Sequence, residues 1–223
     1  TAAAADRGEV EVFRRPRLVI LATGDELASP GQAHCRPGAI PESISYGIAA
    51  FARAHGCEIM RAQHIPDDLG QLARSAEKAV RDADLVIVIG GASVGDRDFS
   101  RRILGETPDY VFSGVAIKPG KPFAYGKVNR NAGGNACHFM GLPGNPVSSF
   151  VTFLLLVRPF VLALQGVTKT GITRTEMTAN FDWPRADKRR EFLRVKRNAQ
   201  GGLDLFHNQS SGVLTSAVWG DGV

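Results

Sequence analysis

Short apolar runs alternate with amphipathic stretches along the first 165 residues. The runs at 17–22 and 85–89 contain β-branched residues and are typical of buried strands, and 58–65 and 138–142 are further strand candidates. Apolar residues recur with helical spacing in the stretches 44–52, 69–80 and 146–164. The strand pattern at 85–89 is apolar at every position, which favours burial on both faces. We therefore predict an α/β fold, a three-layer αβα arrangement around a mostly parallel sheet.

Helix boundary signals support this assignment. Ser43 precedes the first helical stretch and is a candidate N-cap, and Gly56 is suited to its end. Asp68 is a candidate N-cap of the second helix. Pro146 is suited to the first turn of the third. Further strands are expected near 110–117 and 123–128, with a turn at 129–135 between the second of them and the strand at 138–142.

After about residue 168, the alternation of strand and helix patterns gives way to strand patterns alone. Stretches 173–181 and 191–195 have strand patterns, and Gly201-Gly202 indicates a hairpin turn. We expect a linker or remnant at 1–16, an α/β domain at 17–167 and a small all-β domain at 168–223.

Composition and charge narrow the classes of partner. Residues 185–197 hold seven basic and two acidic side chains, an excess that equals the whole net charge of +5. Phe192 alone interrupts this stretch as an aromatic residue, so a solvated face is favoured over a nucleic-acid platform. The three cysteines form no Cys-x-x-Cys pair, which favours reduced thiols in a cytoplasmic protein. The apolar run 150–157 meets Arg158-Pro159, so no membrane span is expected.

Unusual polar residues follow the predicted strands. Because the carboxyl ends of parallel strands form one edge of a sheet, loops that leave them converge there. The candidate site residues in these loops are Thr23, Gly24, Asp25 and Glu26; Asp67; Gly90, Gly91, Ser93, Gly95 and Asp98; Lys118 and Lys121; and Pro143, Gly144, Asn145, Pro146 and Ser148.

The chemistry of this set favours an anionic substrate. Backbone amides of a glycine loop and a helix N-terminus attract phosphate, and lysines attract anions. Carboxylates hold hard cations, and Mg²⁺ typically takes one or two of them together with substrate phosphates. The five histidines lie outside these loops, so no Ser-His-Asp arrangement is indicated.

Five of these stretches together resemble the molybdopterin molybdotransferase family, which includes MoeA and gephyrin. They are Thr23-Gly-Asp-Glu-Leu27, Pro66-Asp-Asp68, Gly90-Gly-Ala-Ser-Val-Gly-Asp-Arg-Asp98, Ala116-Ile-Lys-Pro-Gly-Lys-Pro122 and Gly141-Leu-Pro-Gly-Asn-Pro-Val-Ser148. The resemblance implies a MoaB/Mog-like fold and, by position and texture, the family's small C-terminal β-domain.

The resemblance also implies an activity. Molybdate would enter the dithiolene of adenylylated molybdopterin with release of AMP and assistance from Mg²⁺. By the same resemblance, Glu26, Asp67 and Asp98 match active-site acids and metal ligands, and Lys118 and Lys121 would meet oxyanions. Molybdopterin and molybdate are the expected partners, with a homodimer in the full-length protein and neither nucleic acid nor membrane.

Two departures qualify this expectation. The family has an Asp-Ser/Thr-Asn triplet where this sequence has Glu42-Ser43-Ile44, so one polar contact is missing at Ile44. The family also has a long N-terminal region, whereas about sixteen residues precede the first strand here, so a fragment or a shortened homologue is expected. Binding is then a firmer expectation than turnover.

Two alternatives stay open at the level of sequence. The same sheet, glycine loop and aspartates would serve a molybdopterin adenylyltransferase of the MogA type. The missing N-terminal region and Ile44 would also suit a module that binds molybdopterin without catalysis.

Overall fold

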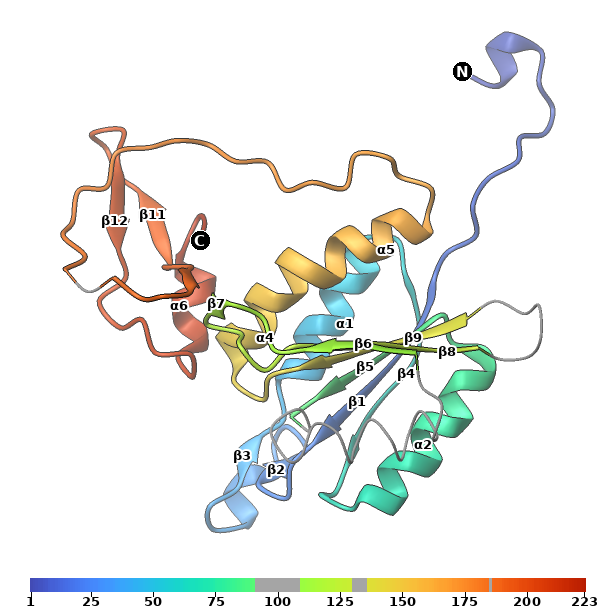
Figure 1. Cartoon of the computed structure of the whole chain (residues 1–223), viewed down its shortest axis with the longest axis horizontal. Coiled ribbons are helices and arrows are strands. Elements are labelled where there is room, and N and C mark those ends of the chain that lie inside the picture. Colours follow the sequence, from blue (N-terminus) through green and yellow to red (C-terminus); the bar gives the residue numbers. More distant parts are fainter. Residues whose placement is uncertain (91–108, 130–135, 185) are drawn as a thin grey trace.

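The computed structural model describes residues 1–90, 109–129, 136–184 and 186–223, and its centre is a six-stranded sheet (Figure 1). The strand order is β4 (Glu58–Ile65), β1 (Arg17–Thr23), β5 (Leu85–Ile89), β9 (Ala136–Leu142), β8 (Ala124–Asn129) and β6 (Asp109–Ser113). The first four strands are mutually parallel, whereas β8 runs antiparallel to both of its neighbours. The predicted mostly parallel sheet is therefore confirmed.

Helices cover both faces of the sheet. Helix α1 (Ile44–Ala54) packs on one face with a long helical run formed by α4 (Pro146–Thr152), the π-helical turn η4 (Phe153–Val157) and α5 (Arg158–Leu164). Helix α2 (Leu69–Asp82) packs on the opposite face. This is the predicted three-layer arrangement (Figure 1).

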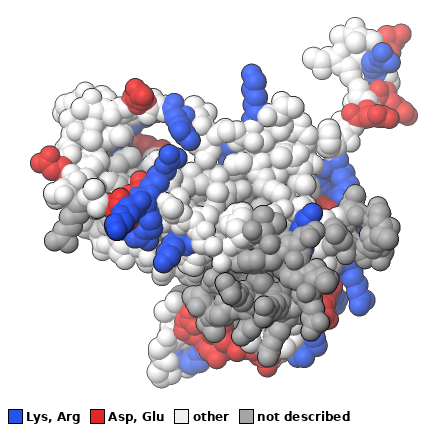
Figure 2. All heavy atoms as spheres, viewed as in Figure 1, with Lys and Arg blue, Asp and Glu red and all other residues white. Residues whose placement is uncertain are grey.

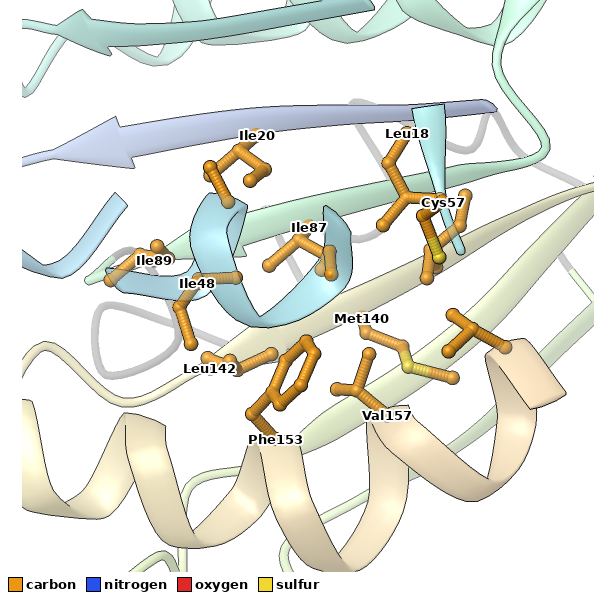
Figure 3. Packing of buried hydrophobic residues seen from close by; sticks show 14 of the residues in the cluster. Leu18, Ile20, Ile48, Cys57, Ile87, Ile89, Met140, Leu142, Phe153 and Val157 are labelled. Carbon is orange, nitrogen blue, oxygen red and sulfur yellow. The ribbon is translucent and has the colours of Figure 1, made fainter. Parts of the chain in front are cut away.

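The alternation of side chains along the central strands explains both contact faces. Leu18 and Ile20 of β1 point toward α1, while Val19 and Leu21 between them point toward α2. Figure 3 shows Ile48 of α1 and Phe153 and Val157 of the long helical run meeting the strand residues of the first face. All residues of β5 are buried, as its uniformly apolar sequence predicts.

The helical run 146–164 corrects one sequence expectation. Its 19 residues continue through Arg158-Pro159 and are long and apolar enough to cross a membrane, by length and composition alone. However, Val151, Phe153 and Val161 have no exposed surface, and the last two belong to the core beneath the sheet. This is the packing of a core helix.

The C-terminal part is a set of short elements. Strand β10 (Arg190–Glu191) pairs with β7 (Ile117–Lys118), and β11 (Val195–Arg197) pairs with β12 (Leu203–Leu205) in the predicted hairpin. The strand expected at 173–181 was wrong, because only a single bridge from Ala179 to Leu203 occurs there. The short helix α6 (Leu214–Trp219) was not predicted.

Smaller elements complete the chain. The first residues form a 3-10 turn, η1 (Ala3–Ala5), in a segment that extends away from the sheet (Figure 1). The loop after β1 contains β2 (Leu27–Ala28), η2 (Ala33–Cys35) and β3 (Ile40–Pro41). The three cysteines are free thiols, of which Cys35 alone is exposed.

Candidate functional site

Three loops meet at the carboxyl edge of the parallel strands. Gly90, at the end of β5, has φ +96°, and a Cβ there would lie 2.5 Å from the carbonyl oxygen of Thr23. A Cβ on Gly144 would lie 3.3 Å from the Cα of Gly90. The loops after β1, β5 and β9 are therefore in backbone contact, and side chains at two of these glycine positions would separate them.

A cleft of about 820 Å³ opens where these loops meet. Its lining combines polar groups on the loops with apolar side chains of α1, α2 and the β2–β3 loop. The lining residues are Thr23, Gly24, Glu26, Leu27, Ile40, Pro41, Glu42, Ser43, Ile44, Asp67, Asp68, Leu69, Leu72, Ile89, Gly90, Pro122, Pro143, Gly144, Asn145, Pro146 and Gly212. An apolar cleft with few polar groups is the usual form of a small-molecule site.

The loop after β1 is held by groups that the sequence did not single out. His64 Nε2 of β4 lies 2.9 Å from the carbonyl oxygen of Gly24. One guanidinium nitrogen of Arg36 donates to the carbonyl oxygens of Asp25 at 2.6 Å and Leu27 at 2.8 Å. Arg36 follows Asp25 by 11 residues and bonds to backbone oxygens, so no local pattern of the sequence indicates this contact.

Asp68 caps a helix, as the sequence suggested, whereas Asp67 bonds to the loop after β1. The carboxylate of Asp68 accepts from the backbone N–H of Gln71 at 2.7 Å and caps α2, which lowers the pKa of Asp68. The Asp67 carboxylate accepts from the Asp25 N–H at 3.4 Å, while Asp25 Oδ1 accepts from the Asp67 N–H at 3.0 Å. This reciprocal pair ties the loop after β1 to the loop after β4.

Helix α1 is capped from one residue earlier than expected. Ser43 makes no side-chain cap bond. Instead, Glu42 accepts from the Ser45 N–H at 2.9 Å and from the Ser45 hydroxyl at 2.5 Å. Glu42 is buried in the cleft wall, and both of its oxygens have partners in the first turn of α1. The next-but-one residue, Ile44, lines the cleft and packs against the core.

The two predicted lysines lie on a bend outside the cleft lining. The Lys118–Pro119 peptide bond is cis, and Gly120 packs against Thr152 of α4. The ammonium of Lys118 lies 2.8 Å from Glu191 and 3.5 Å from Asp187. The hydrogen bond to Glu191 is the main cause that raises the pKa of Lys118.

Lys121 lines a second hollow of about 660 Å³. Its other walls come from the loop before β7 and from the segment before β10: Gly114, Val115, Ala116, Ala186, Asp187, Lys188 and Arg189. Arg189 pairs with Asp187 through two nitrogen–oxygen contacts of 2.9 Å. Figure 2 shows basic side chains gathered beside β7, apart from the acidic side chains near β2 and β3.

The structure therefore separates the predicted residues into groups. The cleft is lined by Thr23, Gly24, Glu26, Asp67, Gly90, Pro143, Gly144, Asn145 and Pro146. Asp25 braces the loop behind them, and Ser148 is buried in the first turn of α4. Gly91, Ser93, Gly95 and Asp98 lie outside the described residues.

Two described carboxylates have the chemistry of Mg²⁺ ligands. Glu26 and Asp67 line the cleft from adjoining loops. Among the residues that the structure describes, no group of three His, Cys, Asp or Glu side chains could hold a metal. These two donors fit a Mg²⁺ ion whose other ligands are water and substrate phosphate, because Mg²⁺ is usually bound in that way.

Comparisons with known proteins identify relatives of this chain. A family model described as "probable molybdopterin binding domain" matches residues 19–163. A molybdopterin molybdenumtransferase of Haemophilus influenzae is 38% identical over 158 residues, which are 71% of this chain and 37% of that protein. One from a Nostoc species is 34% identical over 218 residues, 95% of this chain and 49% of that protein.

Solved structures show the same arrangement. Two structures of the molybdopterin biosynthesis MoeA protein from Pyrococcus horikoshii superpose with TM-scores of 0.77 and 0.73 at 24% and 28% identity. They match 98% and 99% of this chain, but only 51% and 52% of their own. The chain spans about half the length of these relatives or less, and over that span it belongs to the molybdopterin-binding domain family of the MoeA-type molybdenumtransferases.

Proposed function

We propose that this chain carries the molybdopterin site of a molybdopterin molybdenumtransferase. The reaction would insert molybdenum from molybdate into the dithiolene of adenylylated molybdopterin and release AMP. The observation that supports this most is the contact of Thr23, Gly90 and Gly144 beside one cleft that also contains Glu26 and Asp67. The relatives named as molybdenumtransferases point in the same direction.

The cleft has suitable groups for each part of such a substrate. The apolar wall formed by Leu27, Ile40 and Leu69 suits the face of a planar ring. Glu26 and Asp67 would hold Mg²⁺ against a phosphate, which lowers the repulsion between carboxylates and the anionic substrate. The glycine-rich sequence that follows Gly90 lies outside the described residues, and its backbone N–H groups would meet phosphate oxygens.

The second hollow is our proposed molybdate site. Lys121 and Arg189 line it, and cationic side chains attract a doubly charged oxyanion. Lys118 lies nearby in its pairs with Asp187 and Glu191, so it supports the local charge balance. Pro122, the residue after Lys121, lines the cleft, so one bend joins the two hollows.

The test is anaerobic incubation of the chain with adenylylated molybdopterin, molybdate and Mg²⁺, with AMP measured by chromatography. We expect molybdate-dependent AMP release, and Glu26→Gln should lower its rate roughly 10²-fold, the cost of removing one charged group at a reacting centre. Glu77→Gln on the exposed face of α2 is the matched control and should not change the rate.

The other outcomes distinguish the alternatives. Transfer of AMP from Mg-ATP to molybdopterin would support an adenylyltransferase of the MogA type. Tight molybdopterin binding without AMP release would support a binding module. Absence of molybdopterin binding in the cleft would contradict all three.

Several parts of the proposal stay predictions. These are the domain division near residue 167, the homodimer of the whole protein, the cytoplasmic location and the metal-binding role of Asp98. A direct check of Asp98 is Asp98→Asn, which should raise the Mg²⁺ concentration needed for half-maximal AMP release.

A further inference from the structure

Arg194 is a fully buried cation without an acidic partner among the described ion pairs. Its side chain is 1% exposed, the largest side chain in the described structure with so little exposed surface. The guanidinium donates to neutral acceptors: the Ser216 hydroxyl at 3.2 Å and the carbonyl oxygens of Phe192 and Ser210 at 3.3 Å. Burial lowers the pKa of Arg194, with a smaller opposing effect from the charge of Glu191.

Burial of a guanidinium without an acidic partner costs free energy, which its hydrogen bonds must offset. Two of these three contacts, to Ser210 and Ser216, hold residues 209–216 beside β11. The Gln209 side chain accepts from the Arg194 N–H at 2.9 Å and donates to the Arg194 carbonyl oxygen at 3.1 Å. The Ser216 hydroxyl donates onward to the Val213 carbonyl oxygen at 2.7 Å. We name residues 209–216 the arginine-held loop.

The arginine-held loop reaches the candidate cleft. The carbonyl oxygen of Ser211 accepts from the N–H of Val147, in the first turn of α4, at 3.0 Å. The Asn145 side chain makes no cap bond there, so the loop supplies a partner that the helix itself lacks. The next residue, Gly212, lines the cleft.

The chain just before Arg194 reaches the second hollow. The Phe192 N–H donates to the Lys118 carbonyl oxygen at 2.7 Å, and the Arg190 N–H donates to the Ala116 carbonyl oxygen at 2.9 Å. We name residues 118–122 the lysine bend. The segment that leads into Arg194 pairs with residues 116 and 118, at the start of this bend, while the Arg194 side chain holds the loop that binds α4. Arg194 therefore belongs to a segment that contacts the elements of both hollows.

We propose that Arg194 is a positioning residue. It fixes Ser211 and Gly212, at the rim of the cleft, against α4, and it holds them in a constant position relative to the lysine bend. This inference rests on the proposed function for its effect on ligand binding. Its structural part concerns only the contact between Val147 and Ser211.

The test measures amide hydrogen exchange by NMR and molybdopterin affinity in the same variants. In Arg194→Met we expect exchange of the Val147 amide to accelerate about 10-fold, since hydrogen bonds to charged groups hold the loop. Amides of β1 and β5 should exchange as before. The affinity for molybdopterin should fall by a similar factor of about 10, because the rim no longer keeps one position.

Three further variants separate positioning from loss of fold. Ser216→Ala removes one acceptor and should accelerate Val147 exchange by a smaller factor, about 3-fold, with hairpin amides of β11–β12 unchanged. Arg194→Lys should restore part of the protection, because an ammonium keeps the charge but not the planar fork. Arg197→Met, an exposed arginine of the same hairpin, is the control and should match the parent chain.

The outcomes separate the two proposals. Unchanged Val147 exchange in both Arg194→Met and Ser216→Ala overturns the positioning role. Accelerated exchange in a chain that does not bind molybdopterin leaves the positioning role in place and contradicts the proposed function.

Discussion

At the scale of single residues, two glycines have opposite constraints. Gly90 has a positive φ and sits against the Thr23 carbonyl. Gly47 lies on the exposed face of α1, where an added Cβ would have no atom within 4 Å. A side chain at position 90 would therefore clash with its surroundings, whereas one at position 47 would point into open space.

We predict that Gly90→Ala destabilises the chain by about 2–4 kcal/mol, because the new methyl group clashes with backbone and the left-handed φ disfavours alanine. Gly47→Ala should stabilise it by about 0.5–1 kcal/mol, through the better helix propensity of alanine. Urea-unfolding midpoints measure both effects. Equal midpoints for the two variants would contradict the close contact between the loops after β1 and β5.

Residue-level sequence reasoning succeeded where a role follows from local chemistry. Asp68 was predicted as a helix cap and is one. The cap of α1 was assigned to Ser43, because hydroxyls are common caps, but Glu42 makes the bonds through a longer side chain. The pairing of Lys118 with Asp187 and Glu191 joins distant segments, which no local pattern could indicate.

At the scale of elements, the start of α1 is a stability determinant within the cleft wall. Glu42 satisfies the Ser45 N–H and hydroxyl, and it is buried. Helix α1 also presents Ile48 and Ala52 to the core, so fraying of its first turn would loosen that packing.

We predict that Glu42→Ala lowers the free energy of unfolding by about 1–2 kcal/mol, the usual cost of a lost cap plus an unsatisfied buried donor. Ser43→Ala should change it by less than about 0.5 kcal/mol, since Ser43 makes no cap bond. Thermal or urea unfolding compares the pair. The reverse order would mean that Ser43 caps the helix.

Elements were predictable where the predicted strand pairs along its whole length with a neighbouring strand. The apolar runs at 58–65 and 85–89 became β4 and β5 with the expected bounds. The stretch 173–181 has a strand-like pattern, but no neighbouring strand forms a ladder with it. Helix α6 is six residues long and has one buried residue, Ser216, so its apolar periodicity was too short to recognise.

At the scale of the whole molecule, an ion pair attaches the N-terminal segment to the sheet. Both terminal nitrogens of Arg14 lie 2.6 Å from the Asp84 carboxylate, which also accepts from the Arg17 N–H at 2.8 Å. Burial raises the pKa of Asp84, but the hydrogen bonds from Arg14 and Arg17 outweigh it, and the net pKa lies below the ordinary value.

A folded-state pKa below the unfolded one gives stability that is present above about pH 4, the unfolded value, and is lost as the pH falls through the folded value. We predict a coupling between Arg14→Met and Asp84→Asn of about 1 kcal/mol at pH 7, modest because Arg14 is half exposed. A double-mutant cycle by urea unfolding should show this coupling decline in strong acid. A coupling that is constant from about pH 7 to about pH 2 would refute the ion pair.

The overall topology followed from the sequence, but the division into two hollows did not. The mostly parallel sheet with helices on both faces follows from the alternation of strand and helix patterns, whereas the spatial order of the strands was not predicted. The separation of Lys121 from Glu26 depends on the bend at 118–122 and on its pairing with β10, a contact between segments about seventy residues apart.

The uninterrupted helical run from Pro146 to Leu164 has a mechanical consequence. Pro146 borders the cleft, while Leu164 borders a smaller hollow at the opposite end of the sheet with Phe13 and Arg14. With a rise of 1.5 Å per residue, the run acts as a stiff rod about 28 Å long. The cleft and this smaller hollow are therefore joined by one continuous helix, so the spacing between Pro146 and Leu164 is set by helix geometry and not by a loop.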